Sequence, residues 1–322
     1  MSVTKPFFSI VIPLHNKEPH IARALSSVFS QSCSDFEIII IDDASTDGSV
    51  DVVSNFTDKR IKLLSRNTPG PGGYAARNMG IRNAQGQYIA FLDADDCWNK
   101  DHLSSLKLLA QQFPKEQFLS CGWVIMDEEG EQEDPYYHLM QNRGNHCISL
   151  REYLEQTLSG RRPVHTVISC AKNNNFITAG LFPEEKKAKR GGDLHAWLKM
   201  VCSYRSMAWS SHIGGIYYKN NVNMVTRTAL SSTHLLKPEI YNELADGLDK
   251  QEKLLLRKYF NRRLKIAWVV NFNRRANTFF LPSKLFWRGD FINALRFSIR
   301  SFLPRFAVQF VRYLRKLVRG SR

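Results

Sequence analysis

The sequence predicts an α/β protein whose central sheet is mainly parallel and covered by helices on both faces, followed by a helical, basic C-terminal region. Short apolar runs alternate with amphipathic segments through the first hundred residues, as in repeated βα units. The runs are apolar on both faces, which is typical of buried parallel strands. Positive charge is concentrated near the end of the chain: residues 251–322 hold 18 Lys and Arg but 2 Asp and Glu, whereas residues 1–250 hold 27 and 28.

The individual elements follow from hydrophobic spacing. Apolar runs that indicate buried strands cover residues 7–12, 36–41, 61–65 and 88–92. Between them, helical spacing of apolar side chains indicates helices in residues 21–29, 50–56 and 74–84. This βαβαβαβ order predicts parallel strands joined by helical crossovers, and such sheets bind ligands beyond the carboxyl ends of their strands.

The composition excludes several classes of protein. With 43% hydrophobic and 23% charged residues, the 322-residue chain is globular and neither disordered nor collagen-like. It has no run of about 18 apolar residues and opens without the segments of a secretory signal, so we expect a cytoplasmic protein. The six cysteines form no Cys-x-x-Cys pair, which predicts free thiols and argues against a zinc ribbon or a disulfide framework.

Polar residues follow three of the four predicted strands: PLHNKE after the first, DDASTDGS after the second and DADD after the fourth. Asp93, Asp95 and Asp96 are hard oxygen ligands suited to Mg²⁺ or Mn²⁺, and such ions keep positions open for phosphate oxygens. The alternative is that Asp95 and Asp96 cap a helix that begins near Asn99. Their place beside a second acidic strand end favours the ligand interpretation.

Two adjacent carboxylates, Asp42 and Asp43, end the second predicted strand. A carboxylate at this place can accept hydrogen bonds from a base imide or a ribose hydroxyl. Asp, Ser and Gly in the following DDASTDGS segment also favour an Asx-turn. Both interpretations can hold together, one for each aspartate.

The stretch GPGGYA, residues 70–75, matches a dinucleotide-binding fingerprint in form, but it follows the third predicted strand, whereas that fingerprint follows the first. A dehydrogenase is therefore disfavoured. The chain has no G-x-x-x-x-G-K-[ST] motif, which excludes a P-loop nucleotidase. We expect this loop, with Gly73, to let the backbone and Arg77 approach a diphosphate.

Four motifs in order resemble those of family 2 glycosyltransferases with the GT-A fold, of the type that builds bacterial surface polysaccharides. SIVIPLHNKE resembles the opening strand and its turn, keeping Pro13, Asn16 and Glu18 with His15 in the usual aromatic place. FEIIIIDDASTDGS resembles the uracil-reading loop, YAARNMGIRNAQGQYIAFLDADD the run into the metal-binding motif, and GGDLHAWLKM the acceptor-side motif.

This resemblance implies that a sugar is transferred, with inversion, from a nucleoside diphosphate donor to a glycan or lipid-linked acceptor. UDP is the favoured nucleotide. Mn²⁺ or Mg²⁺ is the implied cofactor, held by Asp95 and Asp96. Asp43 is implied to contact the base and Asp93 the ribose. The residues expected to bind the nucleotide sugar are Pro13, His15, Asn16, Glu18, Asp42, Asp43, Gly73, Arg77 and Asp93.

The general base implied by the resemblance is Asp193, since inversion requires a carboxylate opposite the leaving group to take the acceptor proton. Alternatively, Asp193 is the N-cap of a helix over residues 194–201. Two residues depart from the family pattern: Gly192 stands in place of Glu, and Asn221 stands where a histidine often helps to hold the metal. His212 is an alternative candidate for the metal-binding role of that histidine.

Apolar residues recur at spacings of three and four from Arg288 onward, in two helices divided by Pro304, with basic residues between them. The apolar positions are Phe291, Leu295, Ile299, Phe302, Phe306, Phe310, Tyr313 and Leu317. A basic amphipathic helix suits an anionic membrane surface, which predicts a peripheral protein at the inner face of the cytoplasmic membrane. Packing of this stripe on the catalytic body is the alternative. We expect no nucleic acid partner, because no recognition motif accompanies the charge.

These observations predict a catalytic domain over residues 1–225, with a nucleotide-sugar half (1–125) and an acceptor half (126–225), and a helical basic region over residues 226–322. The predicted activity is that of a metal-dependent inverting glycosyltransferase. The alternative, suggested by Gly192 and Asn221, is a catalytically silent module that binds a nucleotide sugar or a membrane.

Overall fold

A computed structural model describes residues 5–176, 181–185, 188–221, 229–231, 233–274 and 282–303. Backbone contacts divide the chain into two compact units, residues 1–235 and 236–322. Each unit is described by itself.

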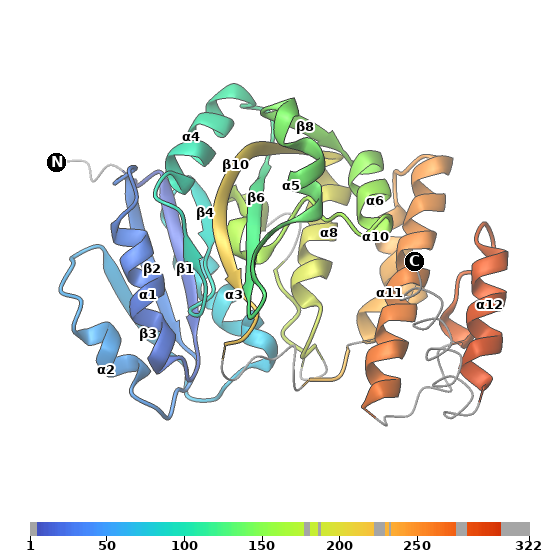
Figure 1. The fold of residues 1–322 in the computed structure, drawn as a ribbon, viewed down its shortest axis with the longest axis horizontal. Coiled ribbons are helices and arrows are strands. Elements are labelled where there is room, and N and C mark those ends of the chain that lie inside the picture. Colours follow the sequence, from blue (N-terminus) through green and yellow to red (C-terminus); the bar gives the residue numbers. More distant parts are fainter. Residues whose placement is uncertain are drawn as a thin grey trace. The chain divides into compact units, whose positions relative to one another are not determined.

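The first half of unit 1 is the predicted parallel sheet (Figure 1). Its strands lie in the order β3-β2-β1-β4, and every neighbouring pair is parallel. The side chains of β1 and β2 are almost all buried, as the apolar runs require. The strands are β1 (Phe8–Leu14), β2 (Phe36–Asp42), β3 (Ile61–Ser65) and β4 (Tyr88–Phe91).

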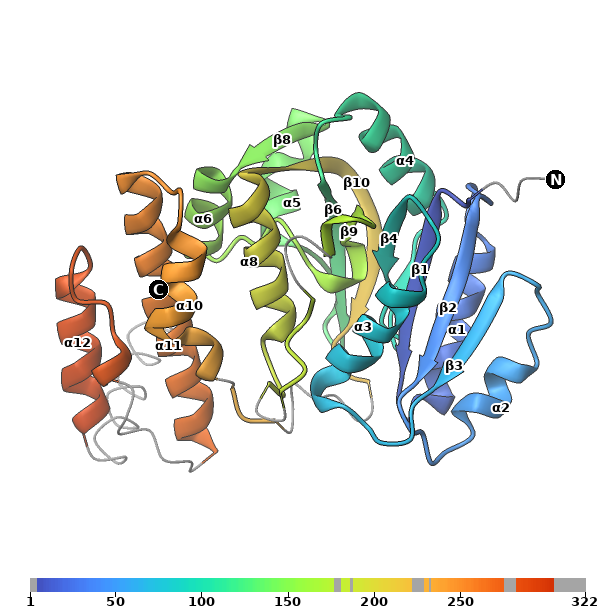
Figure 2. The ribbon, with the colours of Figure 1, turned by 180° about the vertical axis from the view of Figure 1, so that it is seen from behind.

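Helices cover both faces of this sheet, as predicted. Helix α1 (Glu18–Phe29) lies in front of the strands in Figure 1, and α3 (Tyr74–Asn83) lies in front in the reverse view of Figure 2. The short α2 (Ser49–Ser54) packs beside α1. Gly80 lets α3 approach the sheet closely, because a Cβ there would lie 2.5 Å from Val11 Cγ1 and 2.8 Å from Ile41 Cδ1.

The second half of the sheet is mixed, with both parallel and antiparallel strand pairs. The predicted α/β class is confirmed, but all neighbouring strands are parallel only in the first half. The order continues β4-β9-β6-β10-β5, with β9 antiparallel to both neighbours and β10 parallel to β6. Its strands are β5 (Cys97–Trp98), β6 (Phe118–Asp127), β7 (Gly130–Glu133), β8 (His146–Ser149), β9 (Cys170–Lys172) and β10 (Ser206–Tyr218). Its helices are α4 (His102–Gln112), α5 (Pro135–Met140), α6 (Leu150–Leu158) and α8 (Gly192–Tyr204), with 3-10 turns at Gln141–Arg143 and Thr166–Ile168. A further 3-10 turn, Pro71–Gly73, precedes α3 in the first half.

The helix expected near Asn99 begins instead at His102, with Asp101 as its N-cap. The intervening residues Cys97 and Trp98 pair with β10 and continue the sheet. The interpretation of Asp95 and Asp96 as caps of this helix is therefore wrong. All six cysteines lie in the described residues and are free thiols, as predicted.

Unit 2 is helical, with α10 (Pro238–Ala245), α11 (Lys250–Asn273), a 3-10 turn (Pro282–Lys284) and α12 (Phe291–Phe302). A capping box of Asp249 and Glu252 begins α11. Trp268 of α11 packs edge to face on Phe297 of α12, with centroids 5.6 Å apart. The second tail helix, predicted after Pro304, lies outside the described residues. Within the described ranges no helix has the length and apolarity needed to cross a bilayer.

Candidate active site

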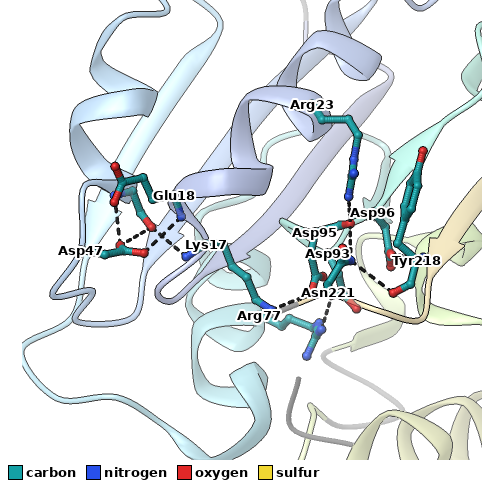
Figure 3. Close-up of polar contacts among 11 residues, drawn as sticks. Lys17, Glu18, Arg23, Asp47, Arg77, Asp93, Asp95, Asp96, Tyr218 and Asn221 are labelled. Atoms are coloured by element: carbon teal, nitrogen blue, oxygen red, sulfur yellow. Dashed lines mark hydrogen bonds and ion pairs between the residues drawn. The ribbon is translucent and has the colours of Figure 1, made fainter. Parts of the chain in front are cut away.

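The DADD segment follows β4, and each of its three carboxylates has a different partner (Figure 3). Asp93 forms an ion pair with Arg77 of α3. Asp95 accepts a hydrogen bond from Lys17 Nζ at 2.6 Å. Asp96 accepts from the backbone N–H of Tyr218 at 3.0 Å. Residues from the N-terminus of α1, from α3 and from β10 thus meet the strand end that the sequence singled out.

Asp96 is the buried member of this group, with 1% exposure. Burial raises the pKa of its carboxyl well above the ordinary value, and the neighbouring charges of Asp95 and Asp93 add to the effect. Among the described residues, its second oxygen, Oδ2, has no hydrogen-bond partner. A cation beside Asp96 would relieve both the repulsion and this unsatisfied acceptor.

The backbone carbonyl of Asp95 accepts from Arg23 Nη2 and from Asn221 Nδ2, the latter at 2.7 Å. Arg23 is itself held 3.7 Å over the ring of Tyr218. Asn221 therefore positions the acidic loop through its backbone. The interpretation of His212 as a substitute for the family's histidine is wrong: it lies on β10 six residues before Tyr218, and the titratable groups that act on it are Asp101 and His102 at the start of α4.

The two aspartates at the end of β2 divide their roles. Asp42 Oδ1 accepts from the backbone N–H of Ser45, three residues on, at 3.0 Å. The Asx-turn of the DDASTDGS segment is made by Asp47, which accepts from the backbone N–H of Ser49 at 3.0 Å. Asp43 is 2% exposed; it forms an ion pair with Arg66 and accepts from the backbone N–H of Gly70 at 3.0 Å. Asp43 therefore joins the end of β2 to the loop that precedes α3.

The turn after β1 is joined to the turn after β2 by side chains of the PLHNKE motif. Asn16, with φ 51°, accepts from the backbone N–H of Thr46 at 2.8 Å. Glu18 accepts from the backbone N–H of Gly48 at 2.9 Å. The exposed ring of His15 lies 2.8 Å from the carbonyl of Asp43. These contacts hold the segment that carries Asp42 and Asp43.

Pro13, Gly73 and Arg77 lie side by side. Gly73 has φ 70°, which favours glycine, and a Cβ there would lie 3.3 Å from Arg77 Nη1 and 3.6 Å from Pro13 Cβ. Arg77 also donates to the carbonyl of Gly72 at 3.1 Å. The Gly73 loop and Arg77 therefore contact each other, and their approach to a diphosphate stays a prediction.

Asp193 lies in the first turn of α8, whose N-cap is Gly191. The interpretation of Asp193 as an N-cap is therefore wrong. Its charge acts on Tyr74, Arg77 and His165, which places the carboxylate near the partner of Asp93. Desolvation lowers the pKa of His165 to about 4, with further lowering by Arg162 and opposition from Asp93 and Asp193.

Gly192 has a structural explanation. Its N–H donates to Tyr74 Oη at 2.9 Å, and a Cβ at residue 192 would lie 2.7 Å from the Tyr74 ring and 2.8 Å from Pro183. Burial, together with the charge of Asp193, raises the pKa of Tyr74. Tyr74 thus occupies the space into which a longer side chain at residue 192 would extend.

Within the described ranges, no three His, Cys, Asp or Glu side chains are arranged as a complete metal site. The adjacent carboxylates of Asp95 and Asp96 still fit a Mn²⁺ or Mg²⁺ ion that completes its shell with water and phosphate oxygens. The buried unpaired oxygen of Asp96 supports this fit.

Several residues of the site were not predicted from the sequence: Lys17, Arg23, Arg66 and Tyr74. Each is a partner of a predicted residue that is distant in the sequence; Lys17 and Asp95, for example, are 78 positions apart. The one available signal was the need for cations beside so many carboxylates. That need does not identify which Lys or Arg side chain lies beside each carboxylate.

Fold and site together define a GT-A-like protein with acidic strand ends around one edge of its sheet. The model of the family "Glycosyl transferase family 2" matches residues 9–172, and the chain belongs to this family. The fold is similar to crystal structures of Staphylococcus aureus TarS: for the complex with UDP-GlcNAc the TM-score is 0.74 at 17% identity, covering 95% of this chain and 91% of that one. A mannosyltransferase of Pyrobaculum calidifontis, in complex with GDP-Man and Mn²⁺, has a TM-score of 0.57 at 17% identity, covering 98% and 81%.

Two curated relatives are similar in sequence over part of the chain. A putative teichuronic acid biosynthesis glycosyltransferase of Bacillus subtilis is 36% identical over 165 residues, covering 50% of this chain and 62% of the relative. The UDP-Glc:alpha-D-GlcNAc-diphosphoundecaprenol beta-1,3-glucosyltransferase of Escherichia coli is 32% identical over 156 residues, covering 47% and 60%. The match thus spans about three fifths of each relative.

Proposed function

We propose that the protein transfers a sugar, with inversion, from a nucleoside diphosphate donor to an acceptor hydroxyl in surface polysaccharide or lipid-linked glycan synthesis. One observation carries the proposal: acidic residues from two strand ends contact the same segment, since Asp43 after β2 accepts from Gly70 in the loop before α3 and Asp93 after β4 pairs with Arg77 of α3. Asp95 and Asp96 follow Asp93 in the same acidic segment. A UDP-sugar is the proposed donor, as in the named TarS complex.

In this proposal the nucleotide lies across the ends of β1, β2 and β4. Asp43 reads the base, with His15 beside it, and Asp93 contacts the ribose. Asn16, Glu18 and Asp42 act through the loop that they hold. Pro13, Gly73 and Arg77 face the diphosphate, where the αL backbone of Gly73 permits close approach.

Asp95 and Asp96 are the proposed ligands of Mn²⁺ or Mg²⁺, which when bound supplies positive charge for the leaving diphosphate. The chain's own contribution there is to hold the acidic loop rigidly, through Arg23 and Asn221 on the Asp95 carbonyl. Rigid placement matters because preorganised groups need no rearrangement as charge develops.

Asp193 is the proposed general base. It accepts the proton of the acceptor hydroxyl while that oxygen bonds to the anomeric carbon, and the electron pair of the broken carbon–oxygen bond leaves with the diphosphate. Its place in the first turn of α8 fixes its direction. Gly192 packs against Tyr74, and Asn221 donates to the Asp95 carbonyl. Both departures from the family pattern are therefore compatible with an active enzyme. We therefore favour an enzyme over a silent binding module.

A screen of nucleotide sugars by thermal unfolding tests the donor proposal. We expect a UDP-sugar with Mn²⁺ to stabilise the protein, by about 2.7 kcal/mol at a hundred times its Kd. Asp43→Asn should lose most of this ligand-induced stabilisation, because the base would lose its charged acceptor.

The control for this screen is Asp58→Asn, which breaks a comparable ion pair with Arg60 beside β3 and outside the site. It should keep the ligand-induced shift. Stabilisation of the Asp43 variant equal to that of the wild type would contradict the assignment of Asp43, and no shift with any nucleotide sugar would contradict the donor proposal.

We also propose that the C-terminal region, residues 226–322, contacts an anionic membrane where a lipid-linked acceptor is reached. In α12 the buried side chains are Ala294, Phe297, Ser298 and Ser301, so the predicted stripe is not the packed face. The side chains of Phe291, Ile292, Leu295, Ile299 and Phe302 are between 41% and 64% exposed. Arg288 and Arg296 lie among them, which complements an anionic surface.

Liposome flotation tests the membrane proposal. The double variant Ile292→Glu and Ile299→Glu should float with anionic vesicles at least about tenfold less than the wild type, because it loses two apolar contacts and adds two negative charges. Leu108→Glu with Leu139→Glu is the matched control, since both leucines are about half exposed in unit 1. Equal flotation of the α12 variant and the wild type would refute the membrane contact.

A further inference from the structure

The first turn of α8, which carries Asp193, is capped by a residue of another helix. Its N-cap is Gly191, which has φ 89° and no side chain to supply a cap. The first N–H groups of a helix have no partner inside the helix and need acceptors from elsewhere. The N–H of Gly192 finds its acceptor on α3, because it donates to Tyr74 Oη at 2.9 Å. The hydroxyl of Tyr74 thus holds the start of the helix that carries the proposed base.

The ring of Tyr74 contacts two glycines from different segments. A Cβ at Gly192 would lie 2.7 Å from Tyr74 Cε2, and a Cβ at Gly72 would lie 2.6 Å from the same atom. These distances are shorter than any van der Waals contact, so both backbones lie directly against the ring. The Cβ at Gly72 would also lie 2.9 Å from the carbonyl oxygen of Lys189, two residues before the N-cap of α8. The Gly73 loop and the start of α8 therefore meet at Tyr74.

The Gly73 loop is the one that we propose to face the diphosphate. The carbonyl of Gly72 accepts from Arg77 at 3.1 Å, and Arg77 pairs with Asp93 after β4. Tyr74 follows this loop directly as the first residue of α3. It is 4% exposed, and burial raises the pKa of its phenol, which stays neutral. One buried side chain thus joins the leaving-group side of the proposed site to the base side.

Inverting transfer needs a fixed spacing between these two sides. The base and the leaving group must lie on opposite sides of the anomeric carbon, and a misplacement of about 1 Å can cost on the order of 10² in rate. We infer that Tyr74 is a positioning residue, whose ring and hydroxyl set the distance between Asp193 and the Gly73 loop. This inference rests on the proposed function. Because Tyr74 acts through Asp193, loss of its hydroxyl should impair the chemical step and leave donor binding intact.

Tyr74→Phe separates the hydroxyl from the ring. Phenylalanine keeps the contacts with Gly72 and Gly192 but removes the acceptor of the Gly192 N–H. We expect kcat to fall about tenfold while the donor Kd stays at the wild-type level, since the ring still limits the displacement of α8. Amide hydrogen exchange in the first turn of α8 should become about fivefold faster, because a buried N–H loses its hydrogen bond.

Turnover is measured as release of UDP from UDP-glucose and from UDP-GlcNAc with Mn²⁺. Water then takes the place of the acceptor hydroxyl and gives its proton to Asp193. Tyr136→Phe is the matched control: Tyr136 of α5 is also buried, and its hydroxyl lies 3.3 Å from His146 Nε2. This control should match the wild type in turnover, donor affinity and exchange at α8. Thermal unfolding checks that each variant is folded.

Gly192→Ala disturbs the same contact from α8, because its Cβ would lie 2.7 Å from the Tyr74 ring. It should likewise lower kcat with the donor Kd unchanged. A double-mutant cycle then tests whether Tyr74 acts through the base. In the Asp193→Asn background, Tyr74→Phe should cause no further loss of turnover, because no base is left to misplace.

Two results would overturn the inference alone: wild-type kcat in both Tyr74→Phe and Gly192→Ala, or an equal loss from Tyr74→Phe with and without Asp193. Full turnover by Asp193→Asn would remove the base and the inference together. A wild type that releases no UDP from either sugar would contradict the proposed UDP-sugar chemistry, and the inference would fail with it.

Discussion

Asp193→Asn is expected to lower sugar transfer by about 10²–10⁴-fold while donor binding stays at the wild-type level. Asparagine keeps the shape of the side chain, but it cannot accept the acceptor's proton. The effect should therefore fall on kcat. Transfer assays combined with donor titration separate the two quantities.

A second carboxylate at a helix start provides the control for this variant. Asp101 begins α4, makes no side-chain capping bond and is exposed, so Asp101→Asn should leave transfer unchanged. Retention of full transfer by Asp193→Asn would remove Asp193 as the base. Its neighbour His165, whose lowered pKa keeps the imidazole neutral at pH 7, would then be the next residue to examine.

Asp95→Asn is expected to lose the Mn²⁺ dependence of donor binding and to reduce transfer by on the order of 10²–10³-fold. The amide is a weaker and uncharged ligand, and it removes the ion pair between Asp95 and Lys17. Donor titration with and without Mn²⁺, in variant and wild type, measures the change directly.

Asp127→Asn is the control, since Asp127 also pairs with a lysine, Lys219, at 3.0 Å at the end of β6. It should keep the metal dependence. If Asp95→Asn responds to Mn²⁺ as the wild type does, the cation is held elsewhere, and the assignment of the DADD segment fails.

The parallel half of the fold could be predicted because its signals are local. The apolar runs of β1 to β4 agree with the observed strands to within two residues, since β1, β2 and β4 are largely buried on both faces. The antiparallel β9 has only three residues, and β5 only two. Periods of two cannot be recognised over such lengths, so these two strands and their antiparallel pairing could not be predicted.

The candidate site could likewise be predicted only in part. Acidic residues at strand ends are visible in the sequence because strand ends are predictable. Their partners are not, since the pairing of Asp43 with Arg66 or of Asp95 with Lys17 depends on how loops from different crossovers meet. The role of Gly192 likewise became clear only from the packing of Tyr74, which is 118 residues away.

The most direct test of the proposed site is a crystal structure of Asp193→Asn with a UDP-sugar and Mn²⁺, in which the substitution prevents turnover. We expect the base beside Asp43, the cation on Asp95 between the protein and the diphosphate, and the anomeric carbon facing residue 193. A nucleotide bound away from the ends of β2 and β4, or a cation that does not touch Asp95, would contradict the proposal.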